Sequence, residues 1–149
     1  MKKLQLLLKA EWQLLNEAKK MFLYSADVCS GYNVAEKNHT MDVADRMEAY
    51  TARFARLLDI YIQKILRIID KIDLNEEGTL RDVINRAAKK GLLADADKLV
   101  QLKIYRNEIA HDYIPAHARN IFFEVREHQI FLLNCISITD KYVEQLLKA

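Results

Sequence analysis

Apolar side chains recur every three or four residues over most of the chain, which predicts a series of helices. The first helix covers residues 2–27, and it ends where Gly31 and Asn33 interrupt the pattern. The second helix would extend for about 30 residues after an N-cap at Thr40. It has the clearest apolar stripe, which consists of Val43, Met47, Tyr50, Phe54, Leu57, Tyr61, Ile65, Ile68 and Ile72.

Two shorter helices follow in the second half of the chain. One begins at a capping-box pattern, Thr79 with Asp82, and ends at Gly91, where a glycine is typical just after the C-cap. The next covers Asp95–Asp112. It is limited by Pro115, because a proline disfavours helical backbone at the residue before it.

The last helix is expected over Ala116–Leu147. Its inward-facing positions are Ile121, Val125, Leu132, Cys135, Ile138, Tyr142 and Leu146. The chain of 149 residues has only 3 glycines and 1 proline, too few for the many tight turns of an all-β fold. The sequence therefore predicts one domain, residues 1–149, folded as an all-α, up-and-down bundle of about five helices.

The long helices also bear on assembly and charge. Continuous apolar and aromatic stripes can bury more surface than one bundle covers, so a homodimer is expected. The net charge of +2 neither requires nor excludes a nucleic-acid partner, because binding depends on local clustering. Two groups could attract RNA phosphates, Arg86 with Lys89 and Lys90, and Lys103 with Arg119, although such groups are more typical of solvated helix faces.

The cysteines and the N-terminus indicate where the protein is located. Cys29 and Cys135 lack metal-ligand spacing, and Cys135 lies in the apolar run IFLLNCISI, which favours a buried thiol in a reducing compartment. Lys9 and Glu11 interrupt the N-terminal apolar run, so neither a signal peptide nor a membrane span is expected. The sequence favours a cytoplasmic protein without a membrane partner.

The segment RNEIAHDY, residues 106–113, concentrates side chains that can do chemistry. On an ideal helix Arg106 and Tyr113 share one stripe, within about 20° of each other, and Asn107 and His111 form a second stripe. Arg106 and His111 are about 140° apart, so they flank the helix and do not stack along it. They would converge more easily if the same segment of a second chain faced this one.

The chain resembles HepT-type proteins of the HEPN superfamily. The resemblance rests on the R-x4-H-x-Y motif in RNEIAHDY, on Asn107 directly after the arginine, and on its position late in an all-α chain, just before a proline. The upstream stretches TLRDVINRAAKKGLL and AYTARFARLLDIYIQKILRIID look like the preceding helices of that family, so the resemblance covers most of the chain.

This resemblance implies a function and several partners. HepT-like proteins are homodimeric helical bundles, and many are toxins that cleave RNA without a metal or other cofactor. Their antitoxin is a minimal nucleotidyltransferase (MNT) that modifies the motif tyrosine with AMP. On this chain Arg106 and His111 would be catalytic, Asn107 supportive, and Tyr113 the modification (AMPylation) site.

The chemistry of RNA cleavage fits these residues. Attack of a 2′-OH on the adjacent phosphate needs a base, an acid for the departing 5′ oxygen, and positive charge near the phosphorus. His111 can act as base or acid, and the forked donors of Arg106 can bind the phosphate. Since each chain has one motif histidine, a composite site in a symmetric dimer is our hypothesis. AMP on Tyr113 would place bulk and negative charge beside Arg106 and compete with RNA.

Two alternatives remain open at the level of sequence. The protein could be a non-catalytic substrate-binding partner of a nucleotidyltransferase, with the same motif and no turnover. It could also hold a di-iron centre, because Glu36–His39 and Glu108–His111 both fit E-x-x-H, which ferritin-like bundles use twice. The second alternative is weaker, since residues 36–39 are expected in a loop and such short motifs arise by chance.

Overall fold

The computed structural model describes residues 2–73, 78–111 and 115–148, with the backbone alone for residues 115 and 116. All regular structure in these ranges is helical, which confirms the all-α prediction. The elements are α1 (Lys2–Val28), α2 (Met41–Asp59), a π-helical segment (Ile60–Leu66), α3 (Arg67–Ile72), α4 (Leu80–Lys89), α5 (Ala96–His111), α6 (Pro115–Glu127) and α7 (Gln129–Lys148).

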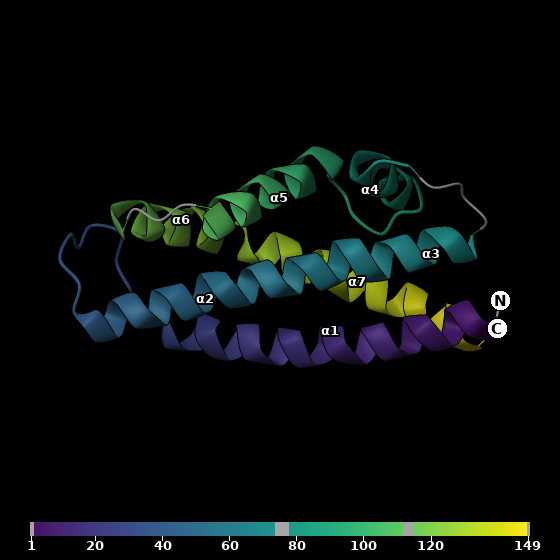
Figure 1. Ribbon diagram of the computed structural model, residues 1–149, viewed down its shortest axis with the longest axis horizontal. Helices are drawn as coiled ribbons and strands as arrows, with labels where there is room; N and C mark the ends of the chain where they lie inside the picture. The colour runs from purple at the N-terminus through teal and green to yellow at the C-terminus, as the bar shows by residue number, and fades with distance from the viewer. Residues whose placement is uncertain (1, 74–77, 112–114, 149) are drawn as a thin grey trace.

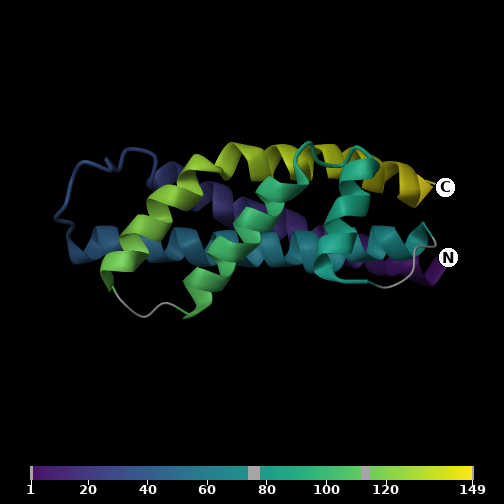
Figure 2. The same ribbon diagram turned by 90° about the horizontal axis from the view of Figure 1, so that it is seen from above.

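The helices form a long bundle with a second group of helices crossing it. Helix α1 is antiparallel to the continuous run from α2 through α3, and α7 lies beside them, so the two termini are at the same end (Figure 1). Helices α4, α5 and α6 lie on the other side of the α2–α3 run from α1 (Figure 1). Seen from above, α5 and α6 cross that run obliquely, whereas α4 crosses it more steeply (Figure 2).

The helix ends that the sequence predicted are confirmed. The Thr40 side chain accepts a hydrogen bond from the Val43 amide at 3.2 Å and caps α2. Thr79 and Asp82 form a reciprocal capping box at the start of α4. Gly91 follows the C-cap of that helix with φ of 80°, a left-handed conformation that only glycine adopts without steric cost.

The long second helix is continuous as predicted, but its middle is not an α-helix. Residues Ile60–Leu66 form a π-helix, with wider turns than the α-helix on either side. Leu57, Tyr61 and Ile65 are four residues apart, a spacing that a wider turn keeps on one face, and all three are fully buried. The Tyr61 hydroxyl lies 3.0 Å from Thr139 Oγ1 on α7, which fixes this segment in the core.

The prediction of one continuous last helix is wrong at His128. The chain there makes a turn, with the His128 amide donating to the Val125 carbonyl at 3.0 Å, and α7 begins at the next residue. The break lets α6 pack across α2 while α7 follows the long axis of the bundle (Figure 2). Ile138 was expected to face inward, but it is 43% exposed, because Ile136 and Thr139 occupy the buried side of α7.

Aromatic rings gather at one end of the core. The ring of Tyr50 lies 5.0 Å from the rings of both Phe22 and Phe122, which joins α1, α2 and α6. Both cysteines are buried and free, and burial raises the pKa of Cys135 to about 12, so this thiol stays protonated at neutral pH. Within the described residues, no helix combines the length and apolarity needed to cross a membrane.

Candidate functional site

Helix α5 carries most of the RNEIAHDY segment. The Asp95 side chain accepts a hydrogen bond from the Lys98 amide at 3.0 Å just before the helix begins. Leu99 and Leu102 are fully buried and fasten the first half of α5 to the bundle. After Leu102 no residue of the helix is fully buried, so the motif lies at the surface of the described structure.

Arg106 is held by an aspartate that the sequence analysis did not single out. Its Nε donates to Asp59 Oδ1 at 2.8 Å, and its Nη2 donates to Asp59 Oδ2 at 2.8 Å, a bidentate pair. The hydrogen bonds to Asp59 raise the pKa of Arg106, which was already far above neutral. The two side chains are 28% and 32% exposed, so the pair is partly open to solvent.

The surroundings of this pair form a small basic cavity. Asp59 is the last residue of α2, directly before the π-helical segment, and π-helical turns are frequent at functional sites. A cavity of about 260 Å³ adjoins the pair and is lined by Asp59, Gln63, Lys64, Lys103 and Arg106, with Ile60 as its apolar wall. Three cations thus face one carboxylate, which leaves a net positive charge that favours an anion.

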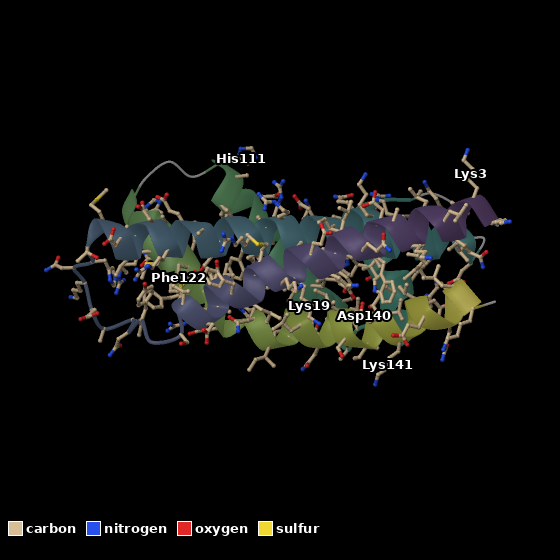
Figure 3. The ribbon with its side chains drawn as sticks, turned by 90° about the horizontal axis from the view of Figure 1, so that it is seen from below. Lys3, Lys19, His111, Phe122, Asp140 and Lys141 are labelled. Carbon is tan, nitrogen blue, oxygen red and sulfur yellow. The ribbon has the colours of Figure 1, made fainter. Side chains whose placement is uncertain are left out.

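Asn107 and His111 lie apart from this cavity. Both are exposed, and they are four residues apart on the same side of α5. His111 is at the end of the helix and points away from the bundle (Figure 3). Among the described residues, no hydrogen bond or ion pair connects Arg106 with either of them. The separation of Arg106 and His111 around the helix agrees with the helical geometry expected from the sequence.

The structure describes some of the other residues in and around the motif but not all of them. Tyr113, predicted as the modification site, and Asp112 lie outside the described residues. Ile109 is half-buried against α2 and α6 and lines a second cavity, separate from the one beside Arg106. Ile104, two residues before Arg106, is 45% exposed, so the outer side of α5 is partly apolar.

The two E-x-x-H pairs do not form a common site in the described structure. Glu36 and His39 lie in the loop between α1 and α2, and His39 Nε2 accepts a hydrogen bond from Arg119 Nε at 3.1 Å. Glu108 and His111 are both exposed on α5. No group of three or more His, Cys, Asp or Glu side chains that could hold a metal ion occurs among the described residues.

The structure separates the basic residues into two kinds. Arg86 and Lys90 are engaged with Asp70 on α3, at 2.6 and 3.5 Å, so they belong to a structural ion-pair network and not to a solvated face. Lys103 lines the cavity beside Arg106, whereas Arg119 is bound to the loop before α2 through the carbonyls of Val34 and Glu36 and through His39.

Asp59 and Lys64 could have been suspected from one feature of the sequence. In the run LLDIYIQKIL they are the two charged residues, and all the others except Gln63 are apolar or aromatic. A charged side chain there needs a partner or solvent. The identity of that partner was out of reach, because Arg106 lies 47 residues further along the chain.

No protein-family model matches the chain, and neither the curated proteins nor the solved structures gave a match.

Proposed function

We propose that this protein is a HepT-like toxin, a metal-independent endoribonuclease of a toxin–antitoxin pair. Arg106 and His111 carry the reaction, Asn107 supports them, and a cognate MNT nucleotidyltransferase silences the enzyme by transferring AMP to Tyr113. The proposal rests on the RNEIAHDY motif and its resemblance to the HEPN superfamily. The observation that supports it best is the position of Arg106 at the edge of a cavity with net positive charge.

Phosphate binding follows from the geometry of that cavity. Asp59 occupies the Nε–Nη2 side of the guanidinium, and Nη1 has no hydrogen-bond partner among the described residues. Arginine has enough donors to keep its carboxylate partner and bind a phosphate oxygen as well. Lys64 and Lys103 add two cations at the same cavity. Asp59 is therefore a positioning residue, which fixes the orientation of Arg106 before the phosphate arrives.

The reaction needs proton transfers that Arg106 does not provide. The 2′ oxygen forms a bond to the neighbouring phosphorus as the bond from phosphorus to the 5′ oxygen breaks. The base takes the proton of the 2′-OH, and the acid gives one to the departing 5′ oxygen, which leaves a 2′,3′-cyclic phosphate. His111 supplies one of these groups, and solvent water exchanges the other proton. Arg106 balances the charge that develops on the phosphorane oxygens.

A second copy of the chain completes the site in this proposal. Since Arg106 and His111 face different sides of α5, one chain does not bring them to the same phosphate in the described structure. The exposed side of α5, with Ile104, Asn107 and His111, would be the contact surface. In an isologous dimer whose contact also covers the opening of the Arg106 cavity, His111 of one chain faces Arg106 of the other.

The experiment is a cleavage assay on single-stranded RNA in the presence of a chelator. The unmodified chain is expected to cleave, and His111→Ala and Arg106→Ala are each expected to lose about 10²- to 10³-fold in rate. Lys141→Ala, an exposed change on α7 at the opposite side of the bundle, is the matched control and should keep full activity (Figure 3). Cleavage that survives in His111→Ala would contradict the assignment.

Mixing variants tests the composite site. If each site takes Arg106 from one chain and His111 from the other, a heterodimer of Arg106→Ala with His111→Ala has one intact site and one dead site. Random pairing then restores about a quarter of the wild-type activity. No restoration, with heterodimers confirmed by mass, means that both residues act within one chain or not at all.

One observation favours the second candidate function, a non-catalytic binding partner of a nucleotidyltransferase. Arg106 is fully engaged at one side by Asp59 and faces away from His111, as a structural ion pair would. In that case co-expression with a neighbouring nucleotidyltransferase gives a complex without RNA cleavage. An AMP-sized mass increase on Tyr113 that stops cleavage instead supports the toxin and its switch.

A further inference from the structure

A trough lies between α2 and α6, with Ile109 of α5 in its lining, and shares no lining residue with the basic cavity. Two adjoining cavities of about 270 and 290 Å³ share Glu48, Thr51 and Ala118 as lining residues. Their size is near the lower end of the range for small-molecule sites, about 300 to 1,000 Å³. The trough therefore suits one flat ring system with a small substituent and not a peptide or a folded partner.

Both cavities contain a pair of hydrogen-bond acceptors, on the exposed residue Glu48 and on the buried residue Thr51. Ile109, Ala118 and Ile121 provide the apolar contacts. The carboxylate of Glu48 only accepts hydrogen bonds when ionised. The hydroxyl of Thr51, which is buried, donates to the Glu48 carbonyl at 3.1 Å, so its remaining lone pairs can also accept.

The outer end of the trough is basic. Lys37 and Arg119 line it together with His39. Arg119 holds the loop before α2 in place by donating to the carbonyls of Val34 and Glu36 and to His39. Lys37 is an exposed residue and has no ion-pair partner among the described residues. The trough thus combines apolar side chains and two acceptors with basic side chains at one end, which favour a phosphate there.

We propose that this trough binds one guanine base of a single-stranded RNA, with Glu48 as the residue that selects it. On their Watson–Crick edges, adenine and cytosine place an acceptor next to the amino group, and uracil places its one N–H between two carbonyls. Guanine presents two adjacent donors, N1–H and the N2 amino group. The two oxygens of a carboxylate accept both, and each such bidentate pair discriminates by about 1–3 kcal/mol. That the trough selects the base for an endoribonuclease rests on the proposed function.

The trough is placed to act together with the motif. Ile109, which contacts the base in this proposal, is one helical turn after Arg106 on α5. Ala52 of the trough and Asp59 of the ion pair are seven residues apart on α2, and so lie on one face of that helix. A single-stranded RNA that runs along this face of α2 would place a guanine in the trough and a nearby phosphate at Arg106.

The direct test is a calorimetric titration of the full-length chain with 5′-mononucleotides. GMP is expected to bind at least about tenfold more tightly than IMP, which lacks the N2 amino group, and than AMP, CMP and UMP. A single-stranded RNA with one guanosine, compared with the same RNA carrying inosine, separates recognition within a strand from binding of the free nucleotide only. Equal affinity for GMP and IMP overturns the role of Glu48, and no binding of either overturns the site.

Two variants of trough residues test whether GMP binds in the trough. Glu48→Gln replaces one acceptor by a donor and should remove the tenfold preference for GMP, whereas Glu17→Gln, an exposed change on α1, should not. Ala118→Leu fills the trough and should weaken all binding while circular dichroism and the unfolding midpoint confirm the fold. Tight GMP binding by both trough variants would contradict the proposal.

The base-binding proposal and the nuclease proposal can fail separately. GMP binding that depends on Glu48, without cleavage of any RNA, leaves the trough standing and refutes the nuclease. Cleavage that depends on His111 but shows the same pattern in wild type and Glu48→Gln leaves the nuclease standing and refutes the trough. If both hold, wild-type cleavage sites share one guanosine at a fixed distance, and Glu48→Gln loses that preference.

Discussion

The α2–α3 run carries two aspartates that each bind an arginine from a crossing helix, and the two pairs have nearly the same geometry. Arg86 on α4 donates through Nε and Nη2 to Asp70 at 2.9 and 2.6 Å. Arg106 on α5 donates through the same atoms to Asp59 at 2.8 Å each. Helices α4 and α5 cross the run next to one another (Figure 2). Hydrogen-bond geometry alone therefore does not distinguish the two pairs.

The surroundings of the Asp70–Arg86 and Asp59–Arg106 pairs do distinguish them. The side chain of Asp70 is only 7% exposed, and Lys90 lies 3.5 Å from it. Lys90 also binds Asp73 at 2.8 Å, and Asp73 accepts a hydrogen bond from the Tyr142 hydroxyl on α7, so the network joins α3, α4 and α7.

The Asp59–Arg106 pair, in contrast, has no further ion-pair partner among the described residues and borders a cavity. One pair stabilises the fold, and the other leaves a guanidinium accessible to a ligand.

The largest expected contrast is between Arg106→Ala and Arg86→Ala. Under the proposed function, Arg106→Ala should lower RNA cleavage by about 10²- to 10³-fold, because a cation that would stabilise the transition state is lost, with little change in the unfolding midpoint. Arg86→Ala should do the reverse, with a clear loss of stability and normal cleavage per folded molecule. Cleavage rates and urea unfolding curves measured on both variants check this, and equal effects of the two changes on cleavage would remove the distinction.

The next contrast concerns the carboxylates. Asp70→Ala leaves Arg86 and Lys90 without their buried partner and is expected to lower the free energy of unfolding by about 3 kcal/mol. Asp59→Ala is expected to lower it by about 1 kcal/mol or less, since both members of that pair are partly solvated. Urea unfolding followed by circular dichroism measures both. A loss of the same size at Asp59 would indicate that this pair is structural as well.

The pH dependence of stability should follow Asp70. Burial raises its pKa, but the hydrogen bonds and positive charges of Arg86 and Lys90 lower it further, so the net shift is downward. The unfolded chain then holds this proton more tightly, and the stabilisation is complete above the ordinary aspartate pKa of about 3.9.

The stabilisation from Asp70 is lost as the pH falls through the lowered pKa that this residue has in the folded protein. Unfolding curves at several pH values below about 5 should show a steep loss in the wild type and a flatter one in Asp70→Asn. An unchanged slope in the variant would assign the acid sensitivity to another carboxylate.

Local patterns predicted the helices and their caps, because those depend on residues a few positions apart. Thr40, the Thr79–Asp82 box and Gly91 all occupy the positions that their sequence neighbours indicate. The break at His128 was missed, since no glycine or proline marks it. It follows from packing, because Ile121, Phe122 and Phe123 are all buried and give α6 contacts on more than one side.

The candidate site was predictable only where the motif itself defines it. Sequence spacing placed Arg106 and His111 on different sides of one helix, and the structure has them so. Asp59 and Glu48 belong to another helix, and only the crossing of α2 by α5 and α6 brings them to the motif. Such contacts depend on how helices pack, which a single sequence does not determine.

The smallest expected effect is also the most specific test of how Asp59 acts. Asp59→Asn keeps the shape of the side chain but removes its charge, so Arg106 is held less firmly and faces a phosphate without competition. The Michaelis constant for RNA should fall a few-fold because binding improves, and kcat should fall a few-fold because orientation is lost. Asp97→Asn, which changes the exposed pair with Arg81, is the matched control and should alter neither constant. A complete loss of kcat would instead mean that Asp59 takes part in the proton transfers, and no change in either constant would mean that the pair does not influence the site.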